Sequence, residues 1–222
     1  AVIKADATTV GDGGTVIIWS DVMTKYFGSI SAKGGAQGGN GGFAEVSGKQ
    51  NLVFKGLVDL SAANGVAGSL LLDPSAIEIV AADPADGSYT TDLTRVDQAG
   101  DANVGAAKTS IDVASINNAL GTVTLAASVS ITQNSGATIS TAADLVFTAP
   151  LITLNDSVTS ASLTLNSSLI TLNGTGVTTT GQQNYNGSVI LNASQTFNAN
   201  SSTITFGGTL LGQNTYNVNA TA

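Results

Sequence analysis

Short stretches in which apolar and polar residues alternate recur along the chain, and the clearest of them follow glycine-rich turns. Three such segments align without gaps, and their starts lie 28 and 26 residues apart: Gly11–Ile18, Gly39–Val46 and Gly65–Leu72. A period of two residues places every second side chain on one face of a β-strand. The inner face predicted from this alignment consists of Val16, Ile18, Ala44, Val46, Leu70 and Leu72.

A second set of repeats has the same period in other parts of the chain. The segment Gly28–Ala32 recurs 28 residues later within Gly56–Ala62, and Leu151–Asn155 returns unchanged as Leu169–Asn173. Further apolar strand segments are spaced 22, 18, 26 and 27 residues apart, and they start at Val123, Leu145, Leu163, Val189 and Tyr216. One structural repeat therefore takes about 18 to 28 residues.

This period, with short strands and no helical segment long enough for a crossover, is typical of stacked β coils, because each coil buries its inner face against the next. We predict an all-β chain that forms a parallel β-helix of about eight coils, roughly 38 Å long. An antiparallel sandwich or barrel is the less favoured alternative. Besides the positions given above, the predicted interior includes Val123, Leu125, Leu163, Leu165, Val189 and Leu191.

Asparagines follow several of the C-terminal strand segments at equivalent positions. The alignment superimposes Asn166, Asn192 and Asn219. In a parallel stack these amides would lie about 4.8 Å apart and could hydrogen-bond to one another as a ladder.

The repeats divide the chain into three parts. Residues 1–80 are glycine-rich coils, residues 81–121 an inserted loop and a short helix, and residues 122–222 Thr/Asn-rich coils continuous with the first. The loop, 81–108, breaks the pattern with five aspartates. The helix is predicted within 112–121, with Asp112 as its N-cap and Gly121 as its C′ residue.

Composition excludes several classes of protein. The chain is 42% apolar but only 10% charged, where about 25% is usual, so it can bury an aliphatic core. Its net charge of −8 and seven basic residues argue against nucleic-acid binding. Because cysteine and histidine are absent, disulfides, thiolate nucleophiles, ordinary zinc sites and imidazole bases are excluded. No apolar run is long enough to span a bilayer.

The carboxylates form no recognisable catalytic pair, and we assign no catalytic, cofactor-binding or metal-binding residue. Glu45 is expected to point outward beside Ile17 and Leu71, and Asp59 shares a face with Leu57 and Ser61. Gly38–Phe43 resembles a calcium-binding nonapeptide, but a phenylalanine replaces the required aspartate. The loop acids lack the alternating spacing of a calcium loop, which favours a solvated segment. They are Asp83, Asp86, Asp92, Asp97 and Asp101.

Two surface features have alternative interpretations. Ile17, Trp19 and Phe43 fall on the outward register, so they either form an exposed patch or lie beneath the 81–108 insertion, which we favour. Seven Asn-X-Ser/Thr sequons could accept glycans, although ladder and turn asparagines explain them without modification. They lie at Asn155, Asn166, Asn173, Asn186, Asn192, Asn200 and Asn219.

Three segments within residues 11–74 carry a resemblance to a known family. They are GDGGTVIIWSD (11–21), YFGSISAKGGAQGGNGGFAEVSGK (26–49) and FKGLVDLSAANGVAGSLLLDP (54–74). These segments resemble two-partner-secretion exoproteins, the filamentous-haemagglutinin-like and high-molecular-weight adhesins of Gram-negative bacteria. The resemblance implies a right-handed β-helix, secretion through an outer-membrane pore partner, and roles in adhesion or biofilm. The secretion-domain motifs Asn-Pro-Asn-Gly and Asn-Ser-Asn-Gly are missing, so this region is not expected to be what the pore recognises.

We therefore expect a non-enzymatic, adhesive shaft segment of a secreted protein at the Gram-negative cell surface. The alternative is a polysaccharide-binding or polysaccharide-degrading β-helix, which the small number of aromatic residues disfavours. Neither end of the chain has the polar character of a solenoid cap. The coils are expected to continue covalently, which we favour, or to stack end to end on another copy.

Overall fold

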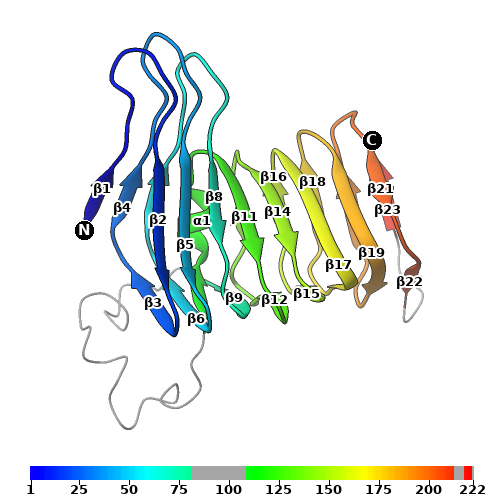
Figure 1. Cartoon of the computed structure of the whole chain (residues 1–222). Helices are drawn as coiled ribbons and strands as arrows, with labels where there is room; N and C mark the ends of the chain where they lie inside the picture. The colour runs from blue at the N-terminus through cyan, green and yellow to red at the C-terminus, as the bar shows by residue number, and fades with distance from the viewer. Residues whose placement is uncertain (82–108, 213–217, 222) are drawn as a thin grey trace.

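The computed structural model describes residues 1–81, 109–212 and 218–221, and it consists almost entirely of parallel β-strands (Figure 1). The strands are arranged in three columns. In each column, strands from successive parts of the chain lie side by side, and all their pairings are parallel. The predicted all-β class is confirmed, and antiparallel pairing between the strands of Val16 and Val46 is excluded.

Within the described residues, the first column contains eight strands. They are β2 (Thr15–Ser20), β5 (Phe43–Gly48), β8 (Ser69–Leu72), β11 (Thr122–Ala126), β14 (Asp144–Thr148), β17 (Ser162–Leu172), β19 (Gln183–Leu191) and β21 (Ile204–Phe206). The offsets of 28 and 26 residues are those of the glycine-turn repeats, since Thr15 pairs with Phe43 and Phe43 with Ser69.

The second column lies next along the chain. It contains β3 (Met23–Tyr26), β6 (Asn51–Phe54), β10 (Ser110–Asp112), β9 (Ala76–Val80), β12 (Ser130–Gln133), β15 (Leu151–Leu154), the later parts of β17 and β19, and β22 (Leu210–Gly212). Because β17 and β19 are long enough to run through both columns, the two columns form one 15-stranded sheet.

The third column consists of two sheets. The first contains β1 (Val2–Lys4), β4 (Ser29–Ser31) and β7 (Leu57–Asp59), and the second contains β13 (Ile139–Ser140), β16 (Val158–Ser160), β18 (Gly176–Thr179), β20 (Gln195–Asn198) and β23 (Val218–Thr221). The helix α1 (Val113–Asn117) lies between the two sheets. A single parallel bridge, from Asp59 to Leu120, extends the first sheet toward the helix.

The interior is aliphatic, as predicted, with aromatic rings near its C-terminal end. All predicted inner residues are buried except Ile18, which is partly buried. Toward the C-terminus the rings of Tyr185, Phe197 and Phe206 pack together, with centroids 4.9 to 5.4 Å apart. Burial of these side chains against neighbouring strands supplies the main driving force for stacking.

Two of the predicted alignments in the C-terminal half are wrong. Leu163 pairs with Gln183 and not with Val189, which pairs with Ile170 in the second column. The cause is that β17 has the same alternation of apolar and polar residues in its first-column part and in its second-column part. The predicted spacing of 26 residues therefore connected Leu163 in the first column with Val189 in the second. Val218 likewise pairs with Gln195 in the third column and not with Leu191.

The short helix was predicted correctly at its start. The Asp112 side chain accepts a hydrogen bond from the Ala114 N–H at 2.8 Å and caps the helix. The helix ends at Asn117 with Asn118 as its C-cap, so Gly121 is not the C′ residue. The strand β10 was not predicted. The loop aspartates between residues 82 and 108 lie outside the described residues.

We call one passage of the chain through the three columns a circuit. The first three circuits extend into a flat projection (Figure 1). We call this projection the wing, and it consists of residues 5–14, 32–42 and 60–68. In each extension, the segment that leaves the third column and the segment that returns to the first column form two legs. The two legs hydrogen-bond to each other; for example, the Gly42 N–H donates to the Ala32 oxygen at 2.7 Å. There is also no room for a side chain between neighbouring circuits of the wing, because a Cβ on Gly41 would lie 1.8 Å from the oxygen of Leu60 in the next circuit. Glycine is therefore required here mainly by close backbone approach.

Candidate functional site

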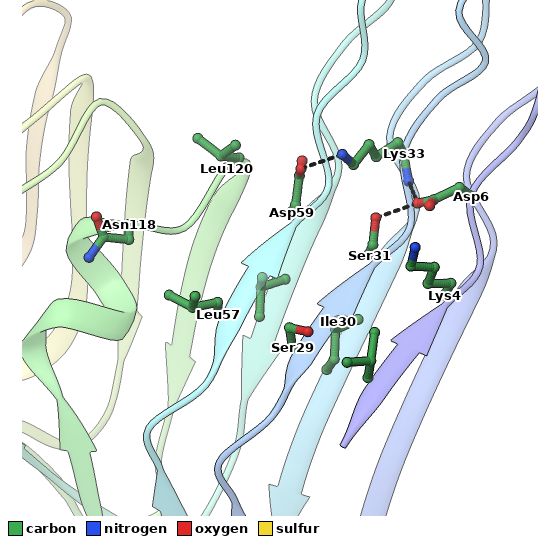
Figure 2. A pocket seen from close by; sticks show the side chains of 12 residues that line it. Lys4, Asp6, Ser29, Ile30, Ser31, Lys33, Leu57, Asp59, Asn118 and Leu120 are labelled. Atoms are coloured by element: carbon green, nitrogen blue, oxygen red, sulfur yellow. Dashed lines mark hydrogen bonds and ion pairs between the residues drawn. The ribbon is translucent and has the colours of Figure 1, made fainter.

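A hollow lies on the outer face of the β1-β4-β7 sheet, beside the base of the wing (Figure 2). Its volume is about 620 Å³. We call it the groove, and its outward-facing lining consists of Val2, Lys4, Asp6, Ser29, Ser31, Lys33, Leu57, Asp59, Asn118 and Leu120.

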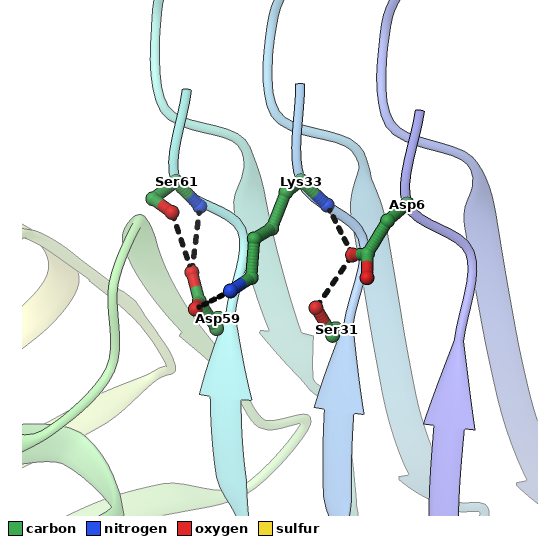
Figure 3. A network of polar contacts seen from close by, with 5 residues as sticks. All are labelled: Asp6, Ser31, Lys33, Asp59 and Ser61. Atoms are coloured by element: carbon green, nitrogen blue, oxygen red, sulfur yellow. Dashed lines mark hydrogen bonds and ion pairs between the residues drawn. The ribbon is translucent and has the colours of Figure 1, made fainter. Parts of the chain in front are cut away.

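Strand alternation explains why polar groups gather in the groove. Ile30 and Val58 are buried in the core, so the residues flanking each of them point outward. Parallel pairing then aligns Lys4, Ser31 and Asp59 across three strands. The chain enters the wing directly after these positions, which brings Asp6 and Lys33 to the upper end of the groove (Figure 3).

Asp59 is the most strongly engaged acid of the groove. Its Oδ2 atom lies 2.8 Å from the ammonium nitrogen of Lys33, and its Oδ1 atom accepts hydrogen bonds from the hydroxyl (2.6 Å) and N–H (3.1 Å) of Ser61 (Figure 3). Partial burial alone would raise the pKa of Asp59, but these contacts outweigh it and lower the pKa below 3.8. The hydrogen bond and charge of Asp59 in turn raise the pKa of Lys33.

Asp6 joins two circuits of the chain. Its Oδ1 atom accepts hydrogen bonds from the Ser31 hydroxyl at 2.5 Å and from the Lys33 N–H at 2.8 Å. Burial opposes ionisation of Asp6, yet these bonds and the charges of Lys33 and Lys4 lower its pKa overall. Within the described part of the chain, neither Asp6 Oδ2 nor the Lys4 ammonium group has a partner within bonding distance.

A second hollow of about 310 Å³ continues from the groove onto one face of the wing. The two hollows share Asp6 and Lys33. The wing part is lined mainly by small residues: Ala7, Thr8, Gly34, Ala36, Ser61 and Ala63. The two hollows therefore adjoin each other at these two side chains.

Exposed apolar side chains also line the groove. Val2, Leu57 and Leu120 are 68%, 57% and 53% exposed. They come from β1, from β7 and from the segment after α1. The groove thus has an apolar border next to its charged network.

The other residues singled out in the sequence lie elsewhere. Glu45 lies between Ile17 and Leu71 on the outer face of the first column, as predicted. Ile17 and Trp19 are 62% and 53% exposed, whereas Phe43 is partly buried. The predicted cover for this surface, residues 81–108, lies almost wholly outside the described residues.

The asparagine ladder exists, but its predicted members are wrong. Asn155, Asn173 and Asn192 form one ladder, with amide-to-oxygen distances of 2.6 and 2.8 Å, and Asn166 bonds to Asn186 at 2.9 Å. The error has the same origin as the column error, because Asn166 and Asn192 follow strands of different columns. Five of the sequon asparagines therefore take part in ladder contacts.

The groove network was not predicted from the sequence. Asp59 pairs with Ser31 on the neighbouring strand, and Lys33 lies two residues after Ser31. The contact between Lys33 and Asp59 is therefore diagonal, and only this diagonal spacing could have indicated it in the sequence. Among the described residues, no group of three or more acidic, cysteine or histidine side chains is placed to hold a metal ion. No described helix has the length and apolar character needed to cross a membrane.

Comparison with known proteins gives no assignment. No family model matches the chain, and no curated protein is significantly similar to it.

Proposed function

We propose that the chain is a right-handed parallel β-helix that serves as a rigid, adhesive shaft segment of a secreted protein at the surface of a Gram-negative bacterium. The chain visits the three columns in order and returns to the first, as in β2-β3-β4 followed by β5-β6-β7. Parallel strands joined by crossovers are right-handed in about 98% of cases, which favours this hand.

The observation that carries the shaft proposal is the unbroken register of the first column. Ile17, Glu45, Leu71, Thr124, Val146, Thr164 and Asn184 follow one another as paired neighbours. Each circuit is bonded to the next by backbone hydrogen bonds, and the asparagine ladders add side-chain bonds at the turns. Repeats that contact only their neighbours form elongated, quasi-one-dimensional structures.

In the groove, the state of the two acids favours a binding role over a polysaccharide-degrading one. A glycosidase or lyase needs an acid or base whose pKa suits proton transfer near working pH. Asp6 and Asp59 have lowered pKa values and are held by hydrogen bonds, so neither suits the role of proton donor. The alternative of polysaccharide binding without cleavage is favoured by the groove itself.

Export through an outer-membrane pore partner is part of the proposal and rests on the family that residues 11–74 resemble. Covalent continuation of the coils into a longer shaft rests on the same resemblance. End-to-end association with another copy is the alternative.

An adhesion assay tests this function. The chain is displayed on non-adherent Gram-negative cells, and retention on epithelial monolayers and on glass is measured under flow. Cells that display the folded chain should be retained at least severalfold better than cells that display Leu165→Asp, which disrupts the core. Equal retention at equal display levels would contradict the adhesive role.

A further inference from the structure

We propose that the groove on the β1-β4-β7 face is a binding site for an uncharged oligosaccharide. The inference rests on the adhesive role proposed above and names the ligand class through which it would act. Three observations carry it: the charge balance of the groove, its unpartnered polar atoms, and the apolar side chains along its border.

The charges of the groove cancel within the groove itself. Lys4 and Lys33 supply two positive charges, and Asp6 and Asp59 supply two negative ones. A ligand with a charge of its own would lose solvation on binding without meeting a net opposite charge. An uncharged ligand avoids this cost, and its hydroxyl groups can still donate to carboxylates and accept from ammonium groups.

The groove offers polar atoms of both kinds. Asp6 Oδ2 and Asn118 Oδ1 are acceptors without a donor in the described part of the chain, and the Lys4 ammonium group and Ser29 hydroxyl are uncommitted donors. Asp6 is held in place by Ser31 and Lys33, so its outward oxygen is preorganised. A ligand that both donates and accepts at closely spaced positions matches this set, and a sugar ring with its hydroxyls has that property.

A peptide fits the groove less well. The common way for a sheet to bind an extended peptide is to add a strand at a free edge through backbone hydrogen bonds. The groove lies on the face of the sheet, and its central strand β4 is paired on both sides, with β1 and β7. Recognition there must come from side chains.

The apolar border and the wing complete the match. Val2, Leu57 and Leu120 expose apolar surface on which the C–H face of a sugar can pack. The hollow on the wing continues the groove past Asp6 and Lys33 over a surface of small residues. The volumes of the two adjoining hollows, about 620 and 310 Å³, suit a chain of several sugar units better than a single one.

The test uses the full chain on an array of neutral oligosaccharides (linear glucans, galactans and mannans) beside uronic-acid and sulfated ones, followed by titration of the best ligand. Asp6→Asn removes the charge and the outward acceptor but retains an oxygen for Ser31 and Lys33. Leu57→Ser removes apolar contact area. Each has a matched control on another face: Asp144→Asn, whose carboxylate accepts from the Ser162 hydroxyl at 2.6 Å, and Leu151→Ser, at a side chain 49% exposed.

We expect neutral glycans to bind, with little dependence on salt, and Asp6→Asn to weaken binding about tenfold or more. Leu57→Ser should weaken it severalfold, and the two controls should leave it unchanged. An acidic ligand would give the opposite sign, because Asp6→Asn would then tighten binding and salt would weaken it. That result, or an array without a neutral ligand, overturns the inference. Adhesion by cells whose displayed chain binds no neutral glycan would refute the ligand class and leave the adhesive role intact.

Discussion

Asn173 donates its side-chain amide to Oδ1 of Asn155 at 2.6 Å and accepts a hydrogen bond on its own Oδ1 from Asn192 at 2.8 Å. The three residues occupy the same turn in successive circuits, so each amide meets the next along the stack. This relationship turns a repeated turn residue into a chain of hydrogen bonds that runs parallel to the long axis.

Removal of the central amide should therefore destabilise the stack. Asn173→Ala breaks two side-chain hydrogen bonds, and we expect it to lower the free energy of unfolding by about 1–2 kcal/mol in urea titrations. The control is Asn134→Ala, one circuit before Asn155, because in the described structure its side chain makes no hydrogen bond. An equal loss in both variants would show that the ladder adds nothing.

The wing should not tolerate a side chain between neighbouring circuits. Gly41→Ala places a Cβ 1.8 Å from the Leu60 oxygen and 2.4 Å from the Gly68 nitrogen, so the second and third circuits of the wing must separate. We expect faster amide hydrogen exchange at Gly42 and Gly68 and a cost of roughly 1–3 kcal/mol. Gly207→Ala, whose Cβ would come no closer than 3.4 Å to its neighbours, should leave wing exchange unchanged. Unaltered exchange in Gly41→Ala would refute the close packing of the second and third circuits in the wing.

Truncation of an inward-facing leucine should lower the free energy of unfolding far more than truncation of an outward-facing one. Leu165 is fully buried, and Leu165→Ala is expected to cost about 2–5 kcal/mol of unfolding free energy. Leu151 is 49% exposed on the neighbouring column, and Leu151→Ala should change stability by about 0.5 kcal/mol or less. Thermal and denaturant unfolding measure both. The reverse order would mean that the inward and outward faces are misassigned.

The Asp59–Lys33 pair predicts the direction of a pH dependence. The lowered pKa of Asp59 means that its contribution to stability is present above about pH 3.8 and is lost as the pH falls through its folded pKa. The raised pKa of Lys33 means that its contribution is present below about pH 10.5 and is lost as the pH rises further. Melting temperatures measured from pH 3 to 7 should fall less steeply on acidification in Asp59→Asn than in the parent chain. A parallel fall in both would contradict the pairing.

The sequence predicted strand register well wherever one repeat is copied with little change. The pairing of Thr15 with Phe43, of Ser29 with Leu57 and of Leu151 with Leu169 follows directly from sequence alignment. Alternation between apolar and polar residues then identifies the inner face, because burial enforces a period of two. These features are local or repeated, and a single sequence contains them.

The features that could not be predicted depend on which column a segment enters. Leu163–Leu165 and Ile170–Leu172 have the same apolar pattern. Both segments belong to β17, but the first lies in the first column and the second in the second column. Strand β10 carries only three residues and inserts between β6 and β9, out of chain order. The groove network needs the circuits to be placed side by side before Lys33 and Asp59 can be recognised as partners.

The central claim is that the circuits form one rigid, regular stack. Spin labels on outward positions of the first column measure this directly, at Ile17 with Thr164, five pairing steps apart, and at Ile17 with Asn184, six steps apart. At about 4.8 Å per step, backbone separations of about 24 and 29 Å are expected. The stack predicts narrow distance distributions whose means differ by about one step after allowance for the label linkers. Broad distributions, or a second distance no longer than the first, would contradict it.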